Sequence, residues 1–308
     1  MPGEQVVLPH PRASELTTFR APDGGVRLVS SGSDALYAWD PATGEQTAMF
    51  EGEWGVFATE ICHPDGRGPV LALATEYGVE WFDAATGARC HGESAFCDTV
   101  WDLAVARTPD GAETLFGAGY CGPHPIYRWD AATGALLPDL GEHDNHIVAV
   151  AVVTLPGGKL MVSATGWSRT IHRWDPATGA ELGPPLAGHT AIVNAMSSAA
   201  LPDGRVLLVS GDSAGVVRRW DAVTGEEVGK PIKAHPASAT VLTTLVAGHP
   251  QLLTSGDDQV IRRWDAVTGE LLDEPAAGCS PVLLTVGGVS SIATCCPVGV
   301  TVRPFQLS

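Results

Sequence analysis

Lysine is scarce in this sequence, and basic residues of both kinds are outnumbered by acidic ones. The 308 residues include three lysines, and 18 lysines and arginines together stand against 35 aspartates and glutamates. The formal net charge is therefore −17 at pH 7. Because so acidic a surface repels phosphate backbones and anionic lipids, nucleic acid and membrane surfaces are excluded as expected partners, and a basic partner is favoured.

Targeting, membrane-spanning and disulfide patterns are also missing. The opening residues, MPGEQVVLPHPR, do not combine a charged segment with an apolar one, as a secretory signal peptide does. No apolar run approaches the length of roughly 18 residues that a membrane-spanning helix needs. The seven cysteines are odd in number and scattered, and Cys295 adjoins Cys296, so we expect no disulfide framework. These absences predict a soluble cytoplasmic protein.

Common catalytic and cofactor-binding motifs are absent as well. The sequence contains no G-x-S-x-G, H-E-x-x-H, P-loop or dinucleotide-binding fingerprint. Two groups of cysteine and histidine look superficially like metal ligands, but neither has the paired spacing of a zinc site. We therefore predict neither a metal site nor a cofactor. The two groups are Cys90, His91 and Cys97, and Cys121 with His124.

What the sequence does contain is an internal repeat. A segment of the type W-D-x-x-T-G occurs six times, at intervals of 43 to 47 residues. A second marker, PDG or a close variant, keeps step with it, so the two together indicate a repeated structural unit. The six segments span residues 39–44, 82–87, 129–134, 174–179, 220–225 and 264–269, with Phe82 replacing tryptophan in the second.

Each repeat predicts a small antiparallel sheet. Short β-rich runs such as VLLVS (206–210) and VVRRW (216–220) are bounded by Gly, Pro and Asp, which is typical of buried strands. The PDG and D-x-x-T-G segments are typical of hairpin turns, where glycine supplies a positive φ and aspartate bonds the turn backbone. A four-stranded sheet cannot bury both of its faces alone, so we expect the sheets to stack as propeller blades.

These units resemble WD40 repeats, of the kind with W-D-x-x-T-G turns that is common in bacterial proteins. The likeness is clearest over residues 186–225, which contain AGHT, LPDG, SGD and RWDAVTG. It implies an all-β, seven-bladed β-propeller formed by residues 1–308 as one domain. The six turns mark six blades, and residues 279–308 supply three strands of a seventh. The segment QVVLP (5–9) is expected to complete that last blade and remove its open edge.

The resemblance also implies a buried tetrad of histidine, aspartate, serine or threonine, and tryptophan in each blade. The sixth repeat fits best, with Asp258 and either Thr254 or Ser255 available to its histidine and tryptophan, His235 and Trp264. Histidines in such a network are structural by expectation, since buried polar groups are normally hydrogen-bonded.

The fifth repeat departs from the pattern. It has His189, Ser210 and Trp220, but Ala214 occupies the position expected for the aspartate. Loss of one member removes a polar network and leaves the apolar core, so the fold is expected to survive.

An arginine precedes the tryptophan in four repeats. Because it recurs with the fold, we predict a structural role, stacking on rings or pairing with turn carboxylates. A ring of anion-binding arginines is the alternative. The four are Arg128, Arg173, Arg219 and Arg263.

Aromatic residues outside the repeat gather in the loops of blades two to four. In WD40 propellers the loops before the innermost strand and before the W-D strand share one face, and the corresponding loops of blades five to seven hold no aromatic ring. Loops on a rigid scaffold often carry binding residues, and Trp and Tyr contribute strongly to contact energies. We predict a binding site on this face lined by Trp54, Tyr77, Phe96, Trp101, Tyr120, His124, His146, Trp167 and Arg169.

Two functions are compatible with this site. The family resemblance favours a monomeric, non-catalytic scaffold that binds a protein or peptide, and a broad exposed patch would support it. The alternative is a cofactor-independent isomerase, lyase or cyclase with a small aromatic ligand in a deep funnel on the same face. Its acid–base groups would be Glu76, Cys121, His124 and His146.

Overall fold

The structure, a computed structural model, consists of short β-strands joined by tight turns. Within the described residues there is no helix, and hence none long and apolar enough to cross a membrane. The described residues are 5–32, 35–50, 55–91, 99–108, 111–119, 126–141, 146–246, 249–272, 276–286, 288–297 and 299–304.

The W-D-x-x-T-G segments form the predicted turns. In the first, Asp40 Oδ1 accepts hydrogen bonds from the backbone N–H groups of Ala42 and Thr43, at 2.8 and 3.2 Å. Gly44 has φ 78° and donates to the Asp40 carbonyl at 2.8 Å, a left-handed conformation that favours glycine. Equivalent turn-capping aspartates are Asp83, Asp130, Asp175, Asp221 and Asp265.

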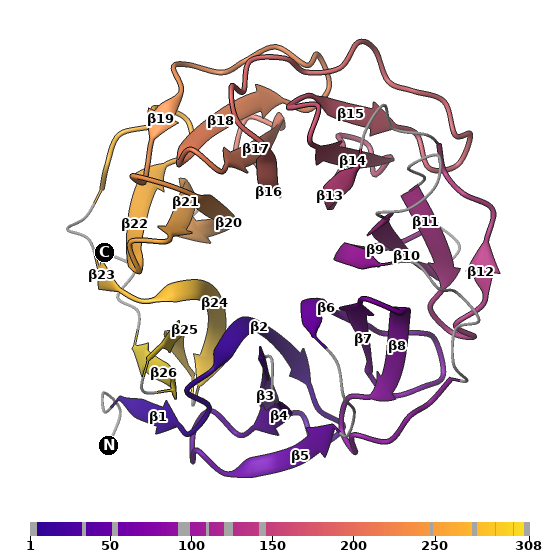
Figure 1. Ribbon diagram of the computed structural model, residues 1–308, viewed down its shortest axis with the longest axis vertical. Helices are drawn as coiled ribbons and strands as arrows, with labels where there is room; N and C mark the ends of the chain where they lie inside the picture. The colour runs from indigo at the N-terminus through magenta and orange to yellow at the C-terminus, as the bar shows by residue number, and fades with distance from the viewer. Residues whose placement is uncertain are drawn as a thin grey trace. The chain divides into compact units, whose positions relative to one another are not determined.

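Seven antiparallel sheets are present in the described part of the chain, and they are the blades of a seven-bladed β-propeller (Figure 1). Three blades lie in a compact unit, unit 1, that comprises Met1–Leu115, Arg128–Leu137 and Gly278–Ser308. Blade one is β2 (Ala13–Arg20), β3 (Val26–Gly32), β4 (Leu36–Trp39) and β5 (Gln46–Phe50), and blade two is β6 (Val56–Cys62), β7 (Val70–Thr75) and β8 (Gly78–Asp83). Blade seven is β24 (Cys279–Val286), β25 (Val289–Cys296) and β26 (Gly299–Pro304) with β1 (Val6–Leu8).

Three further blades lie in unit 2, which comprises Phe116–Tyr127 and Pro138–Ala277. Blade four is β13 (Ile147–Thr154), β14 (Leu160–Gly166) and β15 (Ile171–Trp174), and blade five is β16 (Val193–Ala200), β17 (Val206–Asp212), β18 (Val216–Asp221) and β19 (Ile232–Lys233). Blade six is β20 (Ala239–Val246), β21 (His249–Gly256), β22 (Val260–Asp265) and β23 (Ala276–Ala277). Blade three has residues in both units: β9 (Val100–Arg107), β10 (Glu113–Gly119), β11 (Ile126–Asp130) and β12 (Leu136–Leu137).

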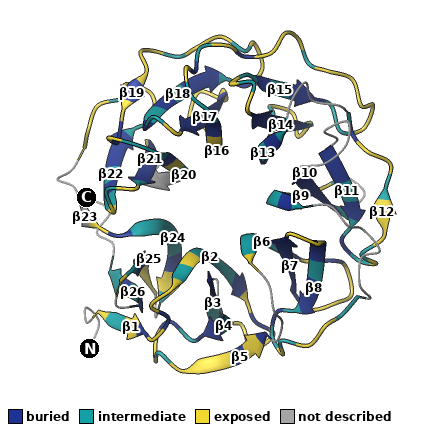
Figure 2. Cartoon of the chain, viewed as in Figure 1, coloured by how far each residue is buried: buried dark blue, intermediate teal, exposed yellow. Residues whose placement is uncertain are grey.

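Blades two and four have three strands in the described residues, where four were expected. In place of the outermost strand there are isolated bridges, such as Phe82 to Arg89 in blade two and Trp174 to Glu181 in blade four. The outermost position of a blade carries the least burial, as the exposed colouring of β5 and β12 in Figure 2 shows. Fewer paired residues are therefore needed there to complete the sheet.

Apolar side chains from adjacent blades form the core. Between blades one and two, Leu36, Phe50, Leu71 and Phe82 are each at most 2% exposed. Phe82, which replaces the repeat tryptophan, packs edge-on against Phe50 with ring centroids 5.7 Å apart. Phenylalanine fills this position because the contact needed here is apolar.

The predicted closing strand is confirmed. β1 pairs antiparallel with β26, with Val6 opposite Val302 and Leu8 opposite Val300. Leu8 is fully buried, whereas Val7 between them points outward and is 48% exposed. The N-terminal segment thus covers what would otherwise be a bare sheet edge in blade seven.

Leu8 should therefore hold this closure in place. We expect Leu8→Ala to lower the free energy of unfolding by about 2–4 kcal/mol, because it leaves a cavity at a fully buried site. Val7→Ala on the same strand should cost less than about 1 kcal/mol. Urea unfolding followed by tryptophan fluorescence measures both, and equal losses would show that β1 does not bury Leu8 as described.

Candidate functional site

In unit 1, a short turn at the end of blade two presents Tyr77. The hydroxyl of Thr75 accepts a hydrogen bond from the Tyr77 backbone N–H and donates one to the Gly78 carbonyl, both at 3.1 Å. This fixes the backbone and leaves the Tyr77 side chain 60% exposed. A hydrogen bond to the Glu76 carboxylate raises the pKa of the Tyr77 phenol. Tyr77 is therefore an exposed ring on an ordered turn.

The segment that leads into β9 contacts this turn. The hydroxyl of Thr99 donates to the Glu76 carbonyl at 3.4 Å, and Trp101 follows as the second residue of β9. The Trp101 ring packs against Phe57 of β6 with centroids 4.4 Å apart. Trp101 is half-buried, so part of the ring contributes to packing between blades two and three and part to the surface.

In unit 2, the loop between β14 and β15 presents Trp167. The Trp167 ring is 48% exposed and meets the His146 ring edge-on, at 5.0 Å between centroids. Its backbone N–H donates to the His146 carbonyl at 3.2 Å. Gly166 permits this approach, because a Cβ there would lie 1.7 Å from the His146 carbonyl oxygen. The two predicted residues His146 and Trp167 are thus brought together.

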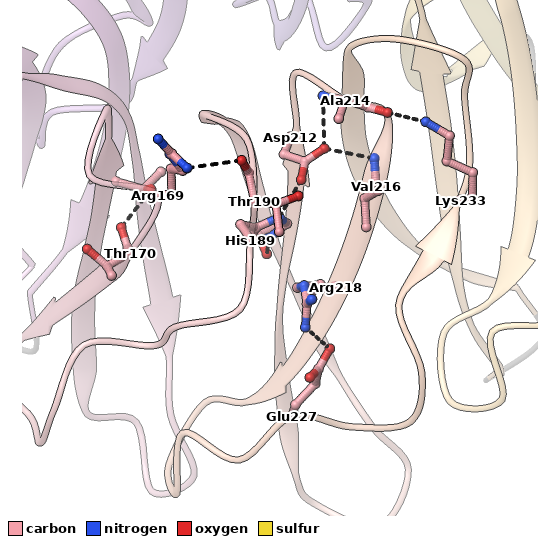
Figure 3. Close-up of polar contacts among 12 residues, drawn as sticks. Arg169, Thr170, His189, Thr190, Asp212, Ala214, Val216, Arg218, Glu227 and Lys233 are labelled. Carbon is pink, nitrogen blue, oxygen red and sulfur yellow. Dashed lines mark hydrogen bonds and ion pairs between the residues drawn. The ribbon is translucent and has the colours of Figure 1, made fainter.

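Arg169 completes the same loop. Figure 3 shows its side chain extending to the neighbouring blade, where Nη1 donates to the Thr190 carbonyl at 3.3 Å. Its φ of 65° is in the left-handed region. Gly215 and Gln259 hold the equivalent turn positions of blades five and six, with φ 79° and 54°. The strain at Arg169 therefore belongs to a recurring turn, in which arginine replaces the glycine that would fit without cost.

The other predicted site residues lie outside the described residues. Glu76 belongs to unit 1 and His146 to unit 2, and of the four groups assigned to the enzyme alternative these are the two that the structure describes. No group of three or more His, Cys, Asp or Glu side chains in the described ranges is placed to hold a metal ion, and the five described cysteines are free thiols. The residues outside are Trp54, Phe96, Tyr120, Cys121 and His124.

Blade five contains a complete tetrad, so the prediction that Ala214 breaks it is wrong. Trp220 Nε1 donates to Ser210 Oγ at 2.9 Å, and Ser210 lies 2.8 Å from His189 Nε2. His189 Nδ1 lies 2.8 Å from Asp212 Oδ2 (Figure 3). Asp212 sits at the end of β17, two residues before the position expected, and its side chain reaches the histidine from there.

This network is buried, and each of its polar side chains has a hydrogen-bond partner. Asp212 also accepts from the backbone N–H groups of Ala214 and Val216, at 3.0 and 2.9 Å. Burial lowers the pKa of His189, opposed by the hydrogen bond to Asp212. A neutral His189 therefore donates from Nδ1 to Asp212 and accepts the Ser210 hydroxyl at Nε2, which satisfies every member.

Blade six repeats the arrangement, and blade one contains its histidine, serine and tryptophan. In blade six Thr254, and not Ser255, links Trp264 Nε1 to His235 Nε2 at 2.9 Å on each side, and His235 Nδ1 lies 2.9 Å from Asp258. In blade one Ser30 joins Trp39 to a histidine that sequence reasoning missed. That residue, His10, lies 2.7 Å from Ser30 Oγ.

Ser210 is the centre of the blade-five network. Ser210→Ala should lower the free energy of unfolding by about 2–4 kcal/mol, because the Trp220 N–H and the His189 nitrogen lose their buried partner. The control Ser213→Ala, at an exposed position of the same blade, should change it by less than about 0.5 kcal/mol. Thermal and urea unfolding measure the difference, and a neutral Ser210→Ala would contradict the tetrad.

Two repeat arginines of unit 2, Arg173 and Arg219, join neighbouring blades through backbone carbonyls, and not through the rings or turn carboxylates that were predicted. Arg219 of blade five donates to the carbonyls of Ala266 and Val267 in blade six, at 3.2 and 2.7 Å, and to that of Lys230 at 3.1 Å. A Cβ on Gly269 would lie 2.8 Å from Arg219 Nη2. A side chain at this position would therefore displace the Arg219 guanidinium, in addition to straining the backbone at its positive φ.

Acidic groups gather on the inner strands of unit 1. The side chains of Glu15 on β2 and Glu60 on β6 are largely surrounded by protein, and this burial raises the pKa of each to about 8. The charge of Asp102 on β9 adds to both shifts, and Cys279 adds a smaller part for Glu15. Three carboxyl groups from three blades thus form one electrostatic cluster.

This cluster should make stability fall as pH rises. Folded Glu15 and Glu60 keep their protons up to about pH 8, whereas the unfolded chain releases them near pH 4.5. Their stabilising effect is complete below pH 4.5 and is lost through pH 8, by up to about 1.4 kcal/mol per pH unit for each group. Urea midpoints between pH 5 and 8 should decline in the wild type and stay flatter in Glu15→Gln/Glu60→Gln.

The exposed Glu226→Gln in unit 2 removes the same type of charge and is the control, since it should leave the pH slope unchanged. A double variant with the wild-type slope would show that the two carboxyl groups are ionised in the folded protein at neutral pH.

Seven antiparallel blades, W-D-x-x-T-G turns and His–Ser/Thr–Trp networks together define a WD-repeat propeller. Comparison with known proteins agrees: the WD40 family, described as "WD domain, G-beta repeat", matches residues 182–221. The chain is thus a WD40-repeat β-propeller.

A solved structure supports the fold over nearly the full length. The crystal structure of the computationally designed Ika8 protein is similar to this chain with a TM-score of 0.63 and 20% sequence identity, covering 98% of this chain and 100% of that one. At this identity the likeness concerns the fold alone. No curated protein matches the chain.

Proposed function

We propose that this protein is a non-catalytic scaffold that recognises a protein or peptide partner through the loop ends of blades two to four. WD40 propellers are commonly interaction scaffolds. The observation that carries the proposal is Trp167, a large ring that is 48% exposed although its backbone and its neighbour His146 hold it in place. An ordered, exposed tryptophan loses little conformational freedom on binding and buries a large area.

Comparison within the repeat supports the assignment. The turns equivalent to the Trp167 loop contain Ser213 and Ala214 in blade five, and Asp257 and Asp258 in blade six. The same backbone turn therefore forms without an aromatic ring, so the fold does not require Trp167. An exposed aromatic side chain that folding does not require is available for binding.

Blade two offers a second exposed ring at the equivalent turn. Tyr77 is 60% exposed, and Glu76 beside it supplies a carboxylate that would pair with a basic side chain. The net charge of −17 favours a basic partner in the same way, through long-range attraction. We place the protein in the cytoplasm, as a monomer, as part of the same proposal.

The test is capture of a partner from lysate of the source cells. Wild-type protein should retain a protein that Tyr77→Ala/Trp167→Ala loses by about tenfold or more, as expected when two anchors are removed. The control Val267→Ala/Leu271→Ala, which removes exposed apolar side chains at the opposite end of blade six, should retain it. Quantitative mass spectrometry of proteins and metabolites measures all three baits.

Arg169→Gly refines the same test, because glycine is the residue that blade five has in this turn. It should raise stability slightly and show whether the arginine contributes to binding. Retention of the same proteins by wild type and the double variant would overturn the proposed interface, and a small molecule held by wild type alone would favour a ligand pocket.

A further inference from the structure

A partly open cavity of about 580 Å³ lies in unit 2 between blades four and five, at the end that carries the W-D turns. It is lined by the turn between β13 and β14, by the segment after the blade-four turn, and by the W-D turn of blade five. The antiparallel strands place these turns at the opposite end of blade four from Trp167. The volume is typical of small-molecule sites. This cavity is therefore distinct from the proposed protein interface.

Arg173 is a buried cation in the wall of the cavity, with a relative exposure of 3%. Its Nη1 and Nη2 make two long hydrogen bonds, 3.3 Å to the Ala222 carbonyl and 3.4 Å to the Pro184 carbonyl. Its Nε has no partner within hydrogen-bond distance among the described residues. A guanidinium has five N–H donors, so most of the donor capacity of Arg173 is unused.

The equivalent residue of blade five shows what a fully structural arginine looks like here. Arg219 makes three carbonyl hydrogen bonds, at 2.7, 3.1 and 3.2 Å, and its Nε, like that of Arg173, has no partner among the described residues. Both arginines occupy the same repeat position and contact the next blade. Arg173 differs because its bonds are fewer and longer and because it faces a cavity large enough for a ligand.

The rest of the lining limits the class of ligand. Leu160, Leu182 and Val223 give the cavity apolar walls. Lys159 is exposed and adds a second cation at the lining. The carboxylate there, Asp175, already accepts two backbone hydrogen bonds in its own turn, at 2.8 and 3.2 Å. An anionic group with an apolar body fits this combination, and the presence of Asp175 favours a single negative charge over a phosphate dianion.

We propose that this cavity binds a monocarboxylate with an apolar body, the carboxylate on Arg173 and Lys159 and the body against Leu160, Leu182 and Val223. The carboxylate could belong to a free organic acid or to the C-terminus of a peptide, and both present the same group to the guanidinium. A carboxylate takes up the donors that the protein leaves unused, in a site where burial strengthens the contact.

Fluorine NMR titration of the full chain with fluorophenylbutyrate and with the neutral fluorophenylbutanol tests the charge requirement. The acid should bind about tenfold or more tightly than the alcohol. A short peptide ending in a phenylalanine carboxylate, compared with its C-terminal amide, tests the second source, and a preference for the carboxylate in either pair supports the proposal. Equal affinities in both pairs, or no saturation by either acid up to about 10 mM, would overturn it.

Matched variants assign the contact to the residues. Arg173→Gln should weaken binding of the acid about tenfold or more, whereas Arg219→Gln, which removes an equivalent inter-blade arginine, should not. Lys159→Glu, at an exposed position, should weaken it about fivefold without changing the melting temperature, and Lys230→Glu serves as its control. Equal losses for Arg173→Gln and Arg219→Gln, or for both lysine variants, would contradict the site.

Discussion

In unit 2, the repeat arginine of one blade packs directly against the turn glycine of the next blade, so each residue limits the space available to the other. Gly269 must adopt a positive φ to close its own hairpin, and a side chain at that position would also collide with Arg219. Gly225 stands in the same relation to Arg173, where a Cβ would lie 2.7 Å from Nη2. Because a single sheet cannot bury both faces, these contacts set how closely neighbouring blades approach, and the apolar side chains between blades pack at that separation.

Much of the fold could be predicted because it depends on local chemistry repeated in sequence. Turns such as 39–44 and the closing segment 5–9 need only glycine, aspartate and alternating apolar residues, and the structure confirms both. The blade-five tetrad was misread because a carboxylate can reach His189 from two backbone positions, and spacing alone does not show that Asp212 is used. His10 was missed although its spacing was a usable signal, since it lies 20 residues before Ser30, much as His189 lies 21 residues before Ser210.

The candidate sites show a second limit on what the sequence alone can predict. Comparison of the repeats singled out Trp167 and Tyr77 as rings that the fold does not require, and the structure finds both exposed on ordered turns. The same comparison sets aside every residue that belongs to the repeat, and Arg173 is one of them. Arg173 and Arg219 cannot be distinguished in sequence. Their difference lies in tenths of an ångström of hydrogen-bond length and in the volume left between two blades.

The pairing of β1 with β26 has a consequence for synthesis. Blades four to six can form from neighbouring hairpins as each emerges from the ribosome, because their contacts are local in sequence. Blade seven needs β1 together with β24, β25 and β26, which are separated from it in sequence by the strands of the six other blades, so its sheet cannot be completed until those three strands have been translated. Until then the apolar edge of β1 must be kept from pairing with other chains, and this is the stage at which a nascent molecule is most exposed to aggregation.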